Sequence, residues 1–323
     1  MMLIDGHSDI LSDVYKRRKN GETNVIKTHY IERFRKGGIQ GLILSIYLDN
    51  SQVLNSLKIA LDYMAFLHEE IEESGNKLCL CLNGTQMERA ISDGQIALMV
   101  SFEGAEPIIS LDLLSVFYGL GVRGIGLTWS RANQVGEGSS YQDGVSTQGL
   151  TPFGMELLDE AARLGMFIDI SHLSDEGVDD VFSWGKGIVI ASHSNSRSLL
   201  NIKRNITDEQ MIEIARRGGT VGLNGTSSQI CAIHQDADYD RLLDHCDHMI
   251  EVMGEDHVAL GFDLCDEIFG STGEPWTKLS FDVIGDYTKY PEFITAMRTR
   301  GYSPEKINKI AGGNLLNVLK RLP

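Results

Sequence analysis

The sequence predicts a closed barrel of eight parallel strands, each followed by a helix. Short apolar runs alternate with longer amphipathic segments along the 323 residues, a pattern typical of βα units around a parallel sheet. Eight such runs can be counted, and this length is common for one (β/α)8 barrel. We therefore expect residues 1–323 to form a single barrel domain. An open doubly wound sheet is the alternative, but no Gly-x-Gly-x-x-Gly follows the first run, which argues against a dinucleotide-binding form.

The expected strands are short apolar stretches between turn signals. In chain order they are residues 2–5, 42–47, 97–102, 124–128, 166–170, 188–192, 220–224 and 258–262, with 78–82 as an extra strand before the third unit. The expected helices are residues 53–72, 111–120, 152–164, 175–184, 208–217, 239–253 and 304–319. Thr151 caps a helix that has proline in its first turn, and Thr207 with Gln210 forms a capping box. The irregular stretches 130–149 and 263–282 are expected to be loops that wall a substrate pocket.

Composition and charge exclude several classes of partner. With 45 acidic and 29 basic residues the net charge is −16, which disfavours nucleic acid and anionic membranes because both attract clustered Lys and Arg. The one basic cluster, Lys16 to Lys19, is expected to be a solvated loop or helix end. No secretion signal or 20-residue apolar span is present, and the five cysteines form no compact framework. We expect a cytoplasmic protein with reduced thiols.

Metal-type side chains follow several of the expected strands. His7 and Asp9 are two residues apart at the end of the first strand, so both side chains are expected on one side. The carboxyl ends of barrel strands share one mouth. The other strand ends carry Glu103, His172, His193 and Asp263.

Three imidazoles and three carboxylates are costly to bury together unless cations neutralise them. We therefore expect two divalent ions, with Glu103 bridging them, His7 and Asp9 completing one site, and His172 and His193 completing the other. Nitrogen and oxygen ligands suit zinc, and manganese, cobalt or nickel fit the same set. Taken singly, each residue could instead be a core histidine, a helix cap or a loop acceptor, but their joint placement favours metal.

The chain resembles the membrane dipeptidase (renal dipeptidase) family, peptidase family M19, within the amidohydrolase superfamily. The resemblance covers nearly the whole chain. It is carried by Asp5-Gly6-His7-Ser8-Asp9, Gly37-Gly38-Ile39-Gln40-Gly41, Ser101-Phe102-Glu103-Gly104, Gly126-Leu127-Thr128, Asp169-Ile170-Ser171-His172, Ala191-Ser192-His193-Ser194-Asn195, Arg204-Asn205-Ile206-Thr207-Asp208 and Gly312-Gly313-Asn314.

The resemblance implies a (β/α)8 barrel with two zinc ions that hydrolyses dipeptides, including some with a D-residue at the C-terminal side. It implies the same ligands as the strand-end argument: His7, Asp9, Glu103, His172 and His193. Asp263 matches the aspartate that takes a proton from the attacking hydroxide and passes it to the leaving amine. Arg204 matches the arginine that contacts the substrate carboxylate. Family members are commonly dimers, so the resemblance also implies a homodimer.

Two departures from the family pattern concern the pocket. Many members place a substrate-contacting histidine directly after Leu-Thr in the fourth strand, where this chain has Trp129. The segment after the eighth strand reads Asp263-Leu264-Cys265-Asp266 where the family usually has Asp-Phe-Asp-Gly. We expect activity with a shifted substrate preference, and Trp129 in contact with substrate.

The functional hypothesis is a binuclear zinc dipeptidase that attacks the peptide carbonyl with a metal-bridging hydroxide. Arg204 would recognise the free carboxylate, and carboxylate or metal groups the free amine. One alternative is a binuclear hydrolase of another small amide, lactone or ester, such as N-acyl amino acids, because a fold and a metal pair do not fix the substrate. Another is a catalytically silent binding protein, but such a protein would have no need for the full ligand set.

Overall fold

The computed structural model describes residues 1–139, 148–265, 268 and 280–323. Among these residues, nine parallel strands form one sheet in the order β7-β6-β5-β4-β2-β1-β9-β8, with β3 paired to β4 beside this path. The strands are β1 (Ile4–Ser8), β2 (Gly41–Tyr47), β3 (Leu78–Leu80), β4 (Ile96–Glu103), β5 (Val122–Gly126), β6 (Phe167–Asp169), β7 (Ile188–Ile190), β8 (Val221–Leu223) and β9 (Val258–Leu260). Each of the nine predicted strand segments overlaps one of these strands.

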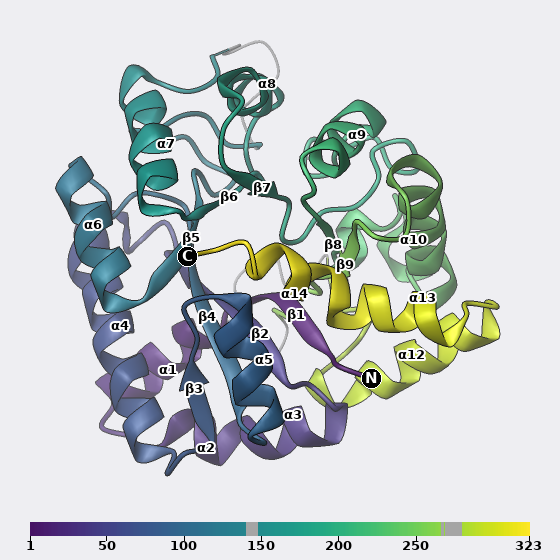
Figure 1. Ribbon diagram of the computed structural model, residues 1–323, viewed down its shortest axis with the longest axis horizontal. Coiled ribbons are helices and arrows are strands. Elements are labelled where there is room, and N and C mark those ends of the chain that lie inside the picture. The colour runs from purple at the N-terminus through teal and green to yellow at the C-terminus, as the bar shows by residue number, and fades with distance from the viewer. Residues whose placement is uncertain (140–147, 266–267, 269–279) are drawn as a thin grey trace.

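Hydrogen bonds between β7 and β8 close the sheet. The peptide N–H of Ala191 donates to the Thr220 oxygen at 3.0 Å, and the N–H of Gly222 donates to the Ala191 oxygen at 2.8 Å. Ala191 and Val221 thereby form a parallel bridge across the seam. Figure 1 shows the strands at the centre with helices around them. The predicted (β/α)8 barrel is confirmed, and the open doubly wound sheet is excluded.

Alternation along the strands divides the core into two parts. On β4, Leu98, Val100 and Phe102 belong to the apolar layer beneath the helices. Ala97 and Met99 belong instead to the cluster inside the barrel, as expected because successive strand residues face opposite sides.

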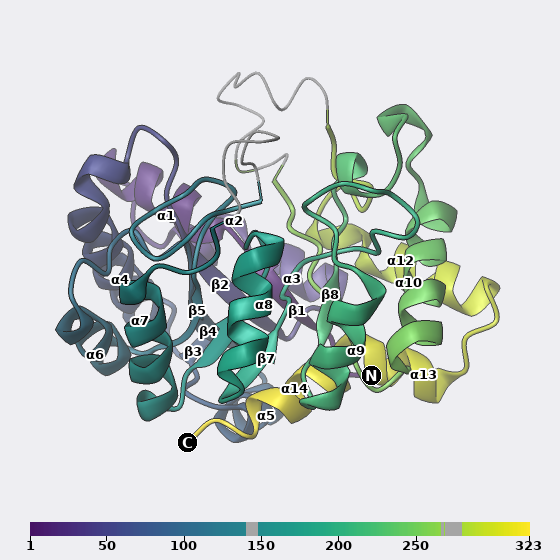
Figure 2. The ribbon, with the colours of Figure 1, turned by 90° about the horizontal axis from the view of Figure 1, so that it is seen from above.

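The C-terminal helix α14 (Asn314–Leu319) covers the end of the barrel where the strands begin. Its Leu315 and Leu319 are buried in the interior cluster, and the Asn314 amide donates to the oxygen of Val258 at the start of β9 at 2.8 Å. Both chain termini lie on this side of the molecule (Figure 2). The opposite end, where the strands finish, remains available for a site.

Most helices follow the prediction. The other described α-helices are α1 (Ile10–Lys19), α2 (Val25–His29), α3 (Ile31–Gly37), α4 (Ser56–Glu73), α5 (Gly84–Ser92), α6 (Leu111–Leu120), α7 (Pro152–Leu164), α8 (Asp175–Trp184), α9 (Asp208–Arg216), α10 (Tyr239–Met253), α12 (Tyr290–Thr299) and α13 (Pro304–Asn308). The predicted helix 304–319 is interrupted by a π-helical turn, Lys309–Gly313, in which Gly312 leaves helical geometry. None of the described helices is long and apolar enough to cross a membrane.

The basic cluster Lys16 to Lys19 is the end of α1, and the expectation that it is solvated is wrong for one member. Arg18 is buried and contacts Glu70 at 3.0 Å, where Glu70 is fully buried on α4. Glu70 also accepts hydrogen bonds from the backbone N–H groups of Val25 and Ile26. The guanidinium is buried because this carboxylate pairs with it, and the pair fixes the start of α2 against α1 and α4.

Candidate metal centre

The six strand-end residues predicted to bind metal or catalyse do converge at one mouth of the barrel. Asp9 follows β1 directly, and Glu103 ends β4. The Nε2 atom of His7 lies 3.8 Å from Asp9 Oδ1 and 3.7 Å from Asp263 Oδ1. Asp263 lies in the segment that follows β9, so residues after β1, β4 and β9 meet at this point.

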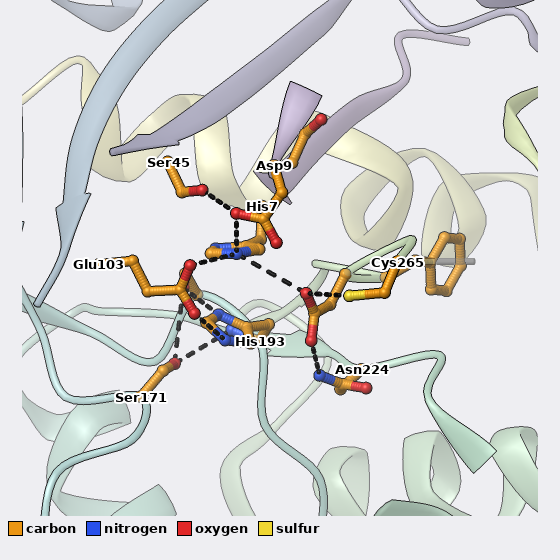
Figure 3. Close-up of polar contacts among 12 residues, drawn as sticks. His7, Asp9, Ser45, Glu103, Ser171, His193, Asn224 and Cys265 are labelled. Atoms are coloured by element: carbon orange, nitrogen blue, oxygen red, sulfur yellow. Dashed lines mark hydrogen bonds and ion pairs between the residues drawn. The ribbon is translucent and has the colours of Figure 1, made fainter. Parts of the chain in front are cut away.

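Glu103 lies at the centre of the group. Its Oε2 atom is 3.2 Å from His7 Nε2, while its Oε1 atom is 3.0 Å from His172 Nε2 and 3.7 Å from His193 Nε2. Each carboxylate oxygen therefore faces a different imidazole group (Figure 3). This is the arrangement that a carboxylate bridging two cations requires.

Two of these residues have left-handed backbones. The φ angles are +68° for His172 and +56° for Asp263, a region that residues other than glycine rarely adopt. Such conformations persist where the surrounding structure holds them, and they cluster at functional sites. Here they occur at the first bends after β6 and β9, where they turn the side chains into the mouth.

Serine hydroxyls contact three of the side chains predicted to bind metal. Ser130 Oγ lies 2.7 Å from His172 Nδ1, and Ser192 Oγ lies 2.6 Å from His193 Nδ1. Ser45, on β2, donates to Asp9. The Nδ1 atoms are thus occupied, and the Nε2 atoms of both histidines face Glu103.

Burial shifts the pKa values of these side chains in the directions that favour their uncharged forms. It raises the pKa of Glu103 to about 8, with the nearby Asp9 adding to the rise. It likewise raises the pKa of Asp263 and lowers the pKa values of His172 and His193 well below the ordinary value. Without a cation, the folded protein therefore disfavours the charged state of these carboxylates.

His7 behaves differently from the other two histidines. Burial lowers its pKa, but Glu103 and Asp9 outweigh burial and raise the pKa well above the ordinary value. The two neighbouring carboxylates thus favour the protonated form of His7. A metal cation would supply the same positive charge at the same place.

The residues present fit bound metal ions. The buried atoms His7 Nε2 and Glu103 Oε2 make no hydrogen bond with any described residue, although they lie close together. There are two sets of potential ligand atoms, and within each set all atoms lie within 4.8 Å of one another. One set comes from His7, Glu103 and His193, and the other from His7, Asp9 and Asp263. Unpaired buried polar atoms of this kind are costly unless a ligand engages them.

A cavity of about 460 Å³ opens beside this cluster. It is lined by Asp9, Glu103, His172 and Asp263, together with the predicted substrate residues Arg204 and Trp129. All eight residues predicted for the site therefore lie in or against one mouth, because His7 and His193 contact the lining residue Glu103.

Arg204 is a guanidinium poised for an anion. It donates from Nη2 to the backbone oxygen of His193 at 3.3 Å, and no carboxylate of the described residues lies within 4 Å of it. Burial lowers its pKa, while Asp263 and Glu103 act in the opposite direction. A carboxylate ligand would compensate this partly buried positive charge.

Trp129 forms an aromatic wall of the cavity with Tyr47. Their ring centroids are 5.5 Å apart, and the Trp129 ring lies 5.8 Å from that of His172. Arg131 stacks over Trp129 at 5.2 Å and pairs with Glu106 at 2.8 Å, so the indole is held from behind.

Sequence reasoning missed several residues at this mouth. His234, which is not among the predicted site residues, lines the cavity from the segment after β8, and Tyr47 lines it from the end of β2. Asp169, Ser130 and Ser192 were not considered as site residues, although Asp169 precedes His172 by three positions and Ser192 adjoins His193. A polar residue at the end of an apolar run was the available signal for Asp169 and Tyr47.

The two predicted wall segments, 130–149 and 263–282, lie partly outside the described residues. The described parts do reach the cavity: Ser130 lies on one side, and Cys265, Ser280, Phe281 and Asp282 on another. Asp266, named in the second family departure, lies outside the described residues.

Comparisons with known proteins agree with this geometry. The sequence profile described as membrane dipeptidase (peptidase family M19) matches residues 1–322. An uncharacterised protein from the pqqA 5′ region of Klebsiella pneumoniae is 34% identical over 80% of this chain and 94% of its own length. Human dipeptidase 3 is 27% identical over 99% of this chain, which spans 65% of that protein.

Two solved structures share the whole fold. A metallopeptidase of Rhodobacter sphaeroides, crystallised with a phosphinate mimic of L-Ala-D-Ala, has a TM-score of 0.88 at 26% identity and covers 100% of this chain and 99% of its own. The dipeptidase AC of family M19 has a TM-score of 0.88 at 27% identity and covers 100% and 98%, respectively.

Proposed function

Because the chain belongs to the membrane dipeptidase family, peptidase family M19, and is a metal-dependent hydrolase, we propose that it is a binuclear zinc dipeptidase. The observation that carries this proposal is the position of Glu103, whose two carboxylate oxygens face different imidazoles within a buried cluster.

His7 and Asp9 would hold one ion, His172 and His193 the other, and Glu103 would contact both. Support comes from the buried atoms His7 Nε2 and Glu103 Oε2, which lie 3.2 Å apart without a hydrogen bond, and from a donor set without thiolate. When bound, two divalent ions supply Lewis acidity to the scissile carbonyl and lower the pKa of a water molecule.

Arg204 would bind the C-terminal carboxylate of the substrate. A guanidinium presents a fork of N–H donors that matches a carboxylate, and its position in the cavity with no described carboxylate partner supports this role. The carboxylates of Asp9 and Glu103 line the same cavity and would favour a free amine. Recognition of both termini would restrict substrates to two residues.

Asp263 would transfer the proton. Asn224 Nδ2 donates to its Oδ2 atom at 3.1 Å, while Oδ1 lies 3.7 Å from His7 Nε2 and is also contacted by Cys265 Sγ at 3.5 Å. In this position it can accept a proton from the attacking water and donate it to the leaving amine. The raised pKa of Asp263, caused chiefly by burial, brings the group closer to the operating pH of such a transfer.

Trp129 and Tyr47 would contact the substrate's side chains. The aromatic wall favours apolar or aromatic residues in the dipeptide, since such rings bury apolar surface. Because the Rhodobacter sphaeroides relative binds a mimic of L-Ala-D-Ala, we include dipeptides with a C-terminal D-residue among the proposed substrates.

The homodimer implied by the resemblance stays a prediction, to be checked by light scattering.

The test combines metal analysis with a substrate panel. Purified protein is assayed for metal content and for hydrolysis of L,L- and L,D-dipeptides, the matching N-acyl amino acids and dipeptide amides, with and without zinc. About two ions per chain and zinc-dependent dipeptide cleavage are expected. Faster turnover of N-acyl amino acids would instead favour the alternative amide hydrolase. Absence of bound metal under every loading condition would contradict the metal centre.

A further inference from the structure

We propose that Asp169 is the positioning residue of the metal centre and that, through Ser192, it fixes the protonation of His193 so that Nε2 presents a lone pair to a metal ion. This inference rests on the proposed metal centre. Asp169 ends β6, is 5% exposed and is not among the residues that line the cavity, so its role would be exerted through its hydrogen-bonded neighbours.

One carboxylate holds both histidine-bearing turns. Asp169 Oδ1 accepts the backbone N–H of Ser171 at 3.0 Å and the backbone N–H of Ser192 at 2.9 Å. These residues directly precede His172 and His193. The turns after β6 and β7 are therefore tied to a single oxygen atom, which sets the distance between the two imidazoles.

The remaining oxygen of Asp169 determines where the Ser192 proton points. Ser192 donates its hydroxyl to Asp169 Oδ2, and the same hydroxyl oxygen lies 2.6 Å from His193 Nδ1. A serine hydroxyl has one proton, and an ionised carboxylate only accepts. The oxygen of Ser192 must then accept from His193, which places the ring proton on Nδ1.

The consequence is at the other nitrogen. A neutral imidazole with its proton on Nδ1 has an unprotonated Nε2. His193 Nε2 lies 2.9 Å from His172 Nε2 and 3.7 Å from Glu103 Oε1, so the lone pair points into the cluster. Metal-binding histidines are commonly fixed in this way by a partner on their second nitrogen.

His172 lacks this constraint. Its Nδ1 atom contacts the Ser130 hydroxyl at 2.7 Å, and Ser130 in turn accepts from Ser139 at 3.4 Å. No described carboxylate receives the Ser130 proton, so that proton is free to point at His172. The contacts of Ser192 with Asp169 and His193 thus set the tautomer of His193. Among the described residues, no carboxylate sets the tautomer of His172 in this way.

Asp169→Asn tests the relay with almost no change of shape. The two backbone N–H groups require an acceptor at the Oδ1 position, so the new amide nitrogen takes the Oδ2 position and donates to Ser192. The other acceptor near Ser192, Ser171 Oγ, is 3.5 Å away and already accepts from the His193 backbone N–H. We therefore expect the Ser192 proton to turn to the closer His193 Nδ1, which moves the ring proton to Nε2. Ser192→Ala removes the relay and leaves His193 Nδ1 without this partner.

Two readouts are measured on each variant. Ring 15N shifts of histidine-labelled, metal-free protein report the tautomer, and competition with a chelator reports zinc affinity. We expect Nδ1–H for His193 in the wild type, Nε2–H in Asp169→Asn, and zinc affinity about 10- to 100-fold weaker in both variants. Ser174→Ala is the matched control: Ser174 is buried near the site and caps α8 by accepting from Gly177 N–H, but it contacts no imidazole.

The control should lose thermal stability and keep its zinc affinity. An unchanged His193 tautomer in Asp169→Asn would overturn the inference, as would zinc affinities that simply follow the melting temperature in all three variants. Wild-type protein that binds no zinc would contradict the proposed function instead, and the tautomer of the metal-free protein would then decide this inference alone.

Discussion

At the scale of single residues, the proposed chemistry depends on a few side chains at the mouth of the barrel. Asp263 adopts a left-handed backbone and has one oxygen occupied by Asn224. The energetic cost of a left-handed backbone is typical of functional sites, and the proposed function of Oδ1 in proton transfer accounts for it here.

Asp263→Asn should keep the shape of the side chain and remove its ability to accept a proton. We expect kcat for dipeptides to fall about 10²- to 10⁴-fold, the usual range for loss of a general acid and base, with two metal ions still bound. Steady-state kinetics beside metal analysis of the same sample check this. Asp93→Asn, on an exposed residue at the end of α5, is the control and should be neutral. Full turnover in Asp263→Asn with both metals present would rule out the proton transfer.

Arg204→Lys should keep the charge and remove the fork that matches a carboxylate. Hydrogen bonds to charged groups contribute about 1.5–3 kcal/mol, so kcat/KM for a dipeptide should fall roughly 10- to 100-fold, mainly through KM. The corresponding dipeptide amide, which lacks the carboxylate, should be affected much less. An equal loss for both substrates would show that Arg204 supports the site in another way.

The residues of the site divide into those that the sequence could predict and those that it could not. His7, Asp9 and Glu103 lie at or beside the ends of strands, and parallel strands bring such ends together by geometry alone. His234 lines the cavity from the segment after β8. Nothing local to its sequence position indicates that contact.

At the scale of elements, helices with clear capping signals were predicted to within a residue. Thr151 accepts from Gly154 N–H at the start of α7, and Thr207 with Gln210 forms the expected capping box of α9. Helices α1, α2 and α3 were not predicted, and none of them has a side-chain hydrogen bond at its N-cap. Helices α5 and α12 were also missed, although Asn83 caps the former.

The first residue of α8, Asp175, forms a salt bridge whose contribution to stability should be lost at acid pH. Asp175 is bound at 2.8 Å by both terminal nitrogens of Arg197 and at 2.9 Å by Lys203. Partial burial raises the pKa of Asp175, but these hydrogen bonds outweigh it and lower the pKa to about 2.

A carboxyl group with a depressed folded-state pKa stabilises the protein above its unfolded pKa, and this contribution disappears as the pH falls through the folded value. Between about pH 4 and pH 2, metal-free wild type should therefore lose ~2 kcal/mol more unfolding free energy than Asp175→Asn. Urea unfolding at several pH values measures the difference. Parallel pH dependences of the two proteins would contradict the assignment.

At the scale of the whole molecule, closure of the barrel and formation of the metal centre depend on the same seam. Gly222 on β8 bonds to Ala191 through its N–H, and its oxygen accepts from Ser194 N–H at 2.7 Å. His193 lies between these two contacts. A barrel that failed to close here would lose a proposed metal ligand together with its last strand pairing.

Gly222→Ala should open this seam. A Cβ atom at Gly222 would lie 1.8 Å from the Ser192 oxygen, a backbone atom that cannot move without displacing His193. We expect a loss of about 3 kcal/mol or more of unfolding free energy and zinc affinity reduced beyond that of any surface variant, measured by urea unfolding and chelator competition. Gly119→Ala is the control, because a Cβ there meets no atom within 4 Å. In the exposed part of α6 it should stabilise the protein by roughly 0.5–1 kcal/mol. If Gly222→Ala were as stable as this control and bound zinc normally, the closing contact between β7 and β8 would not be what holds His193 in place.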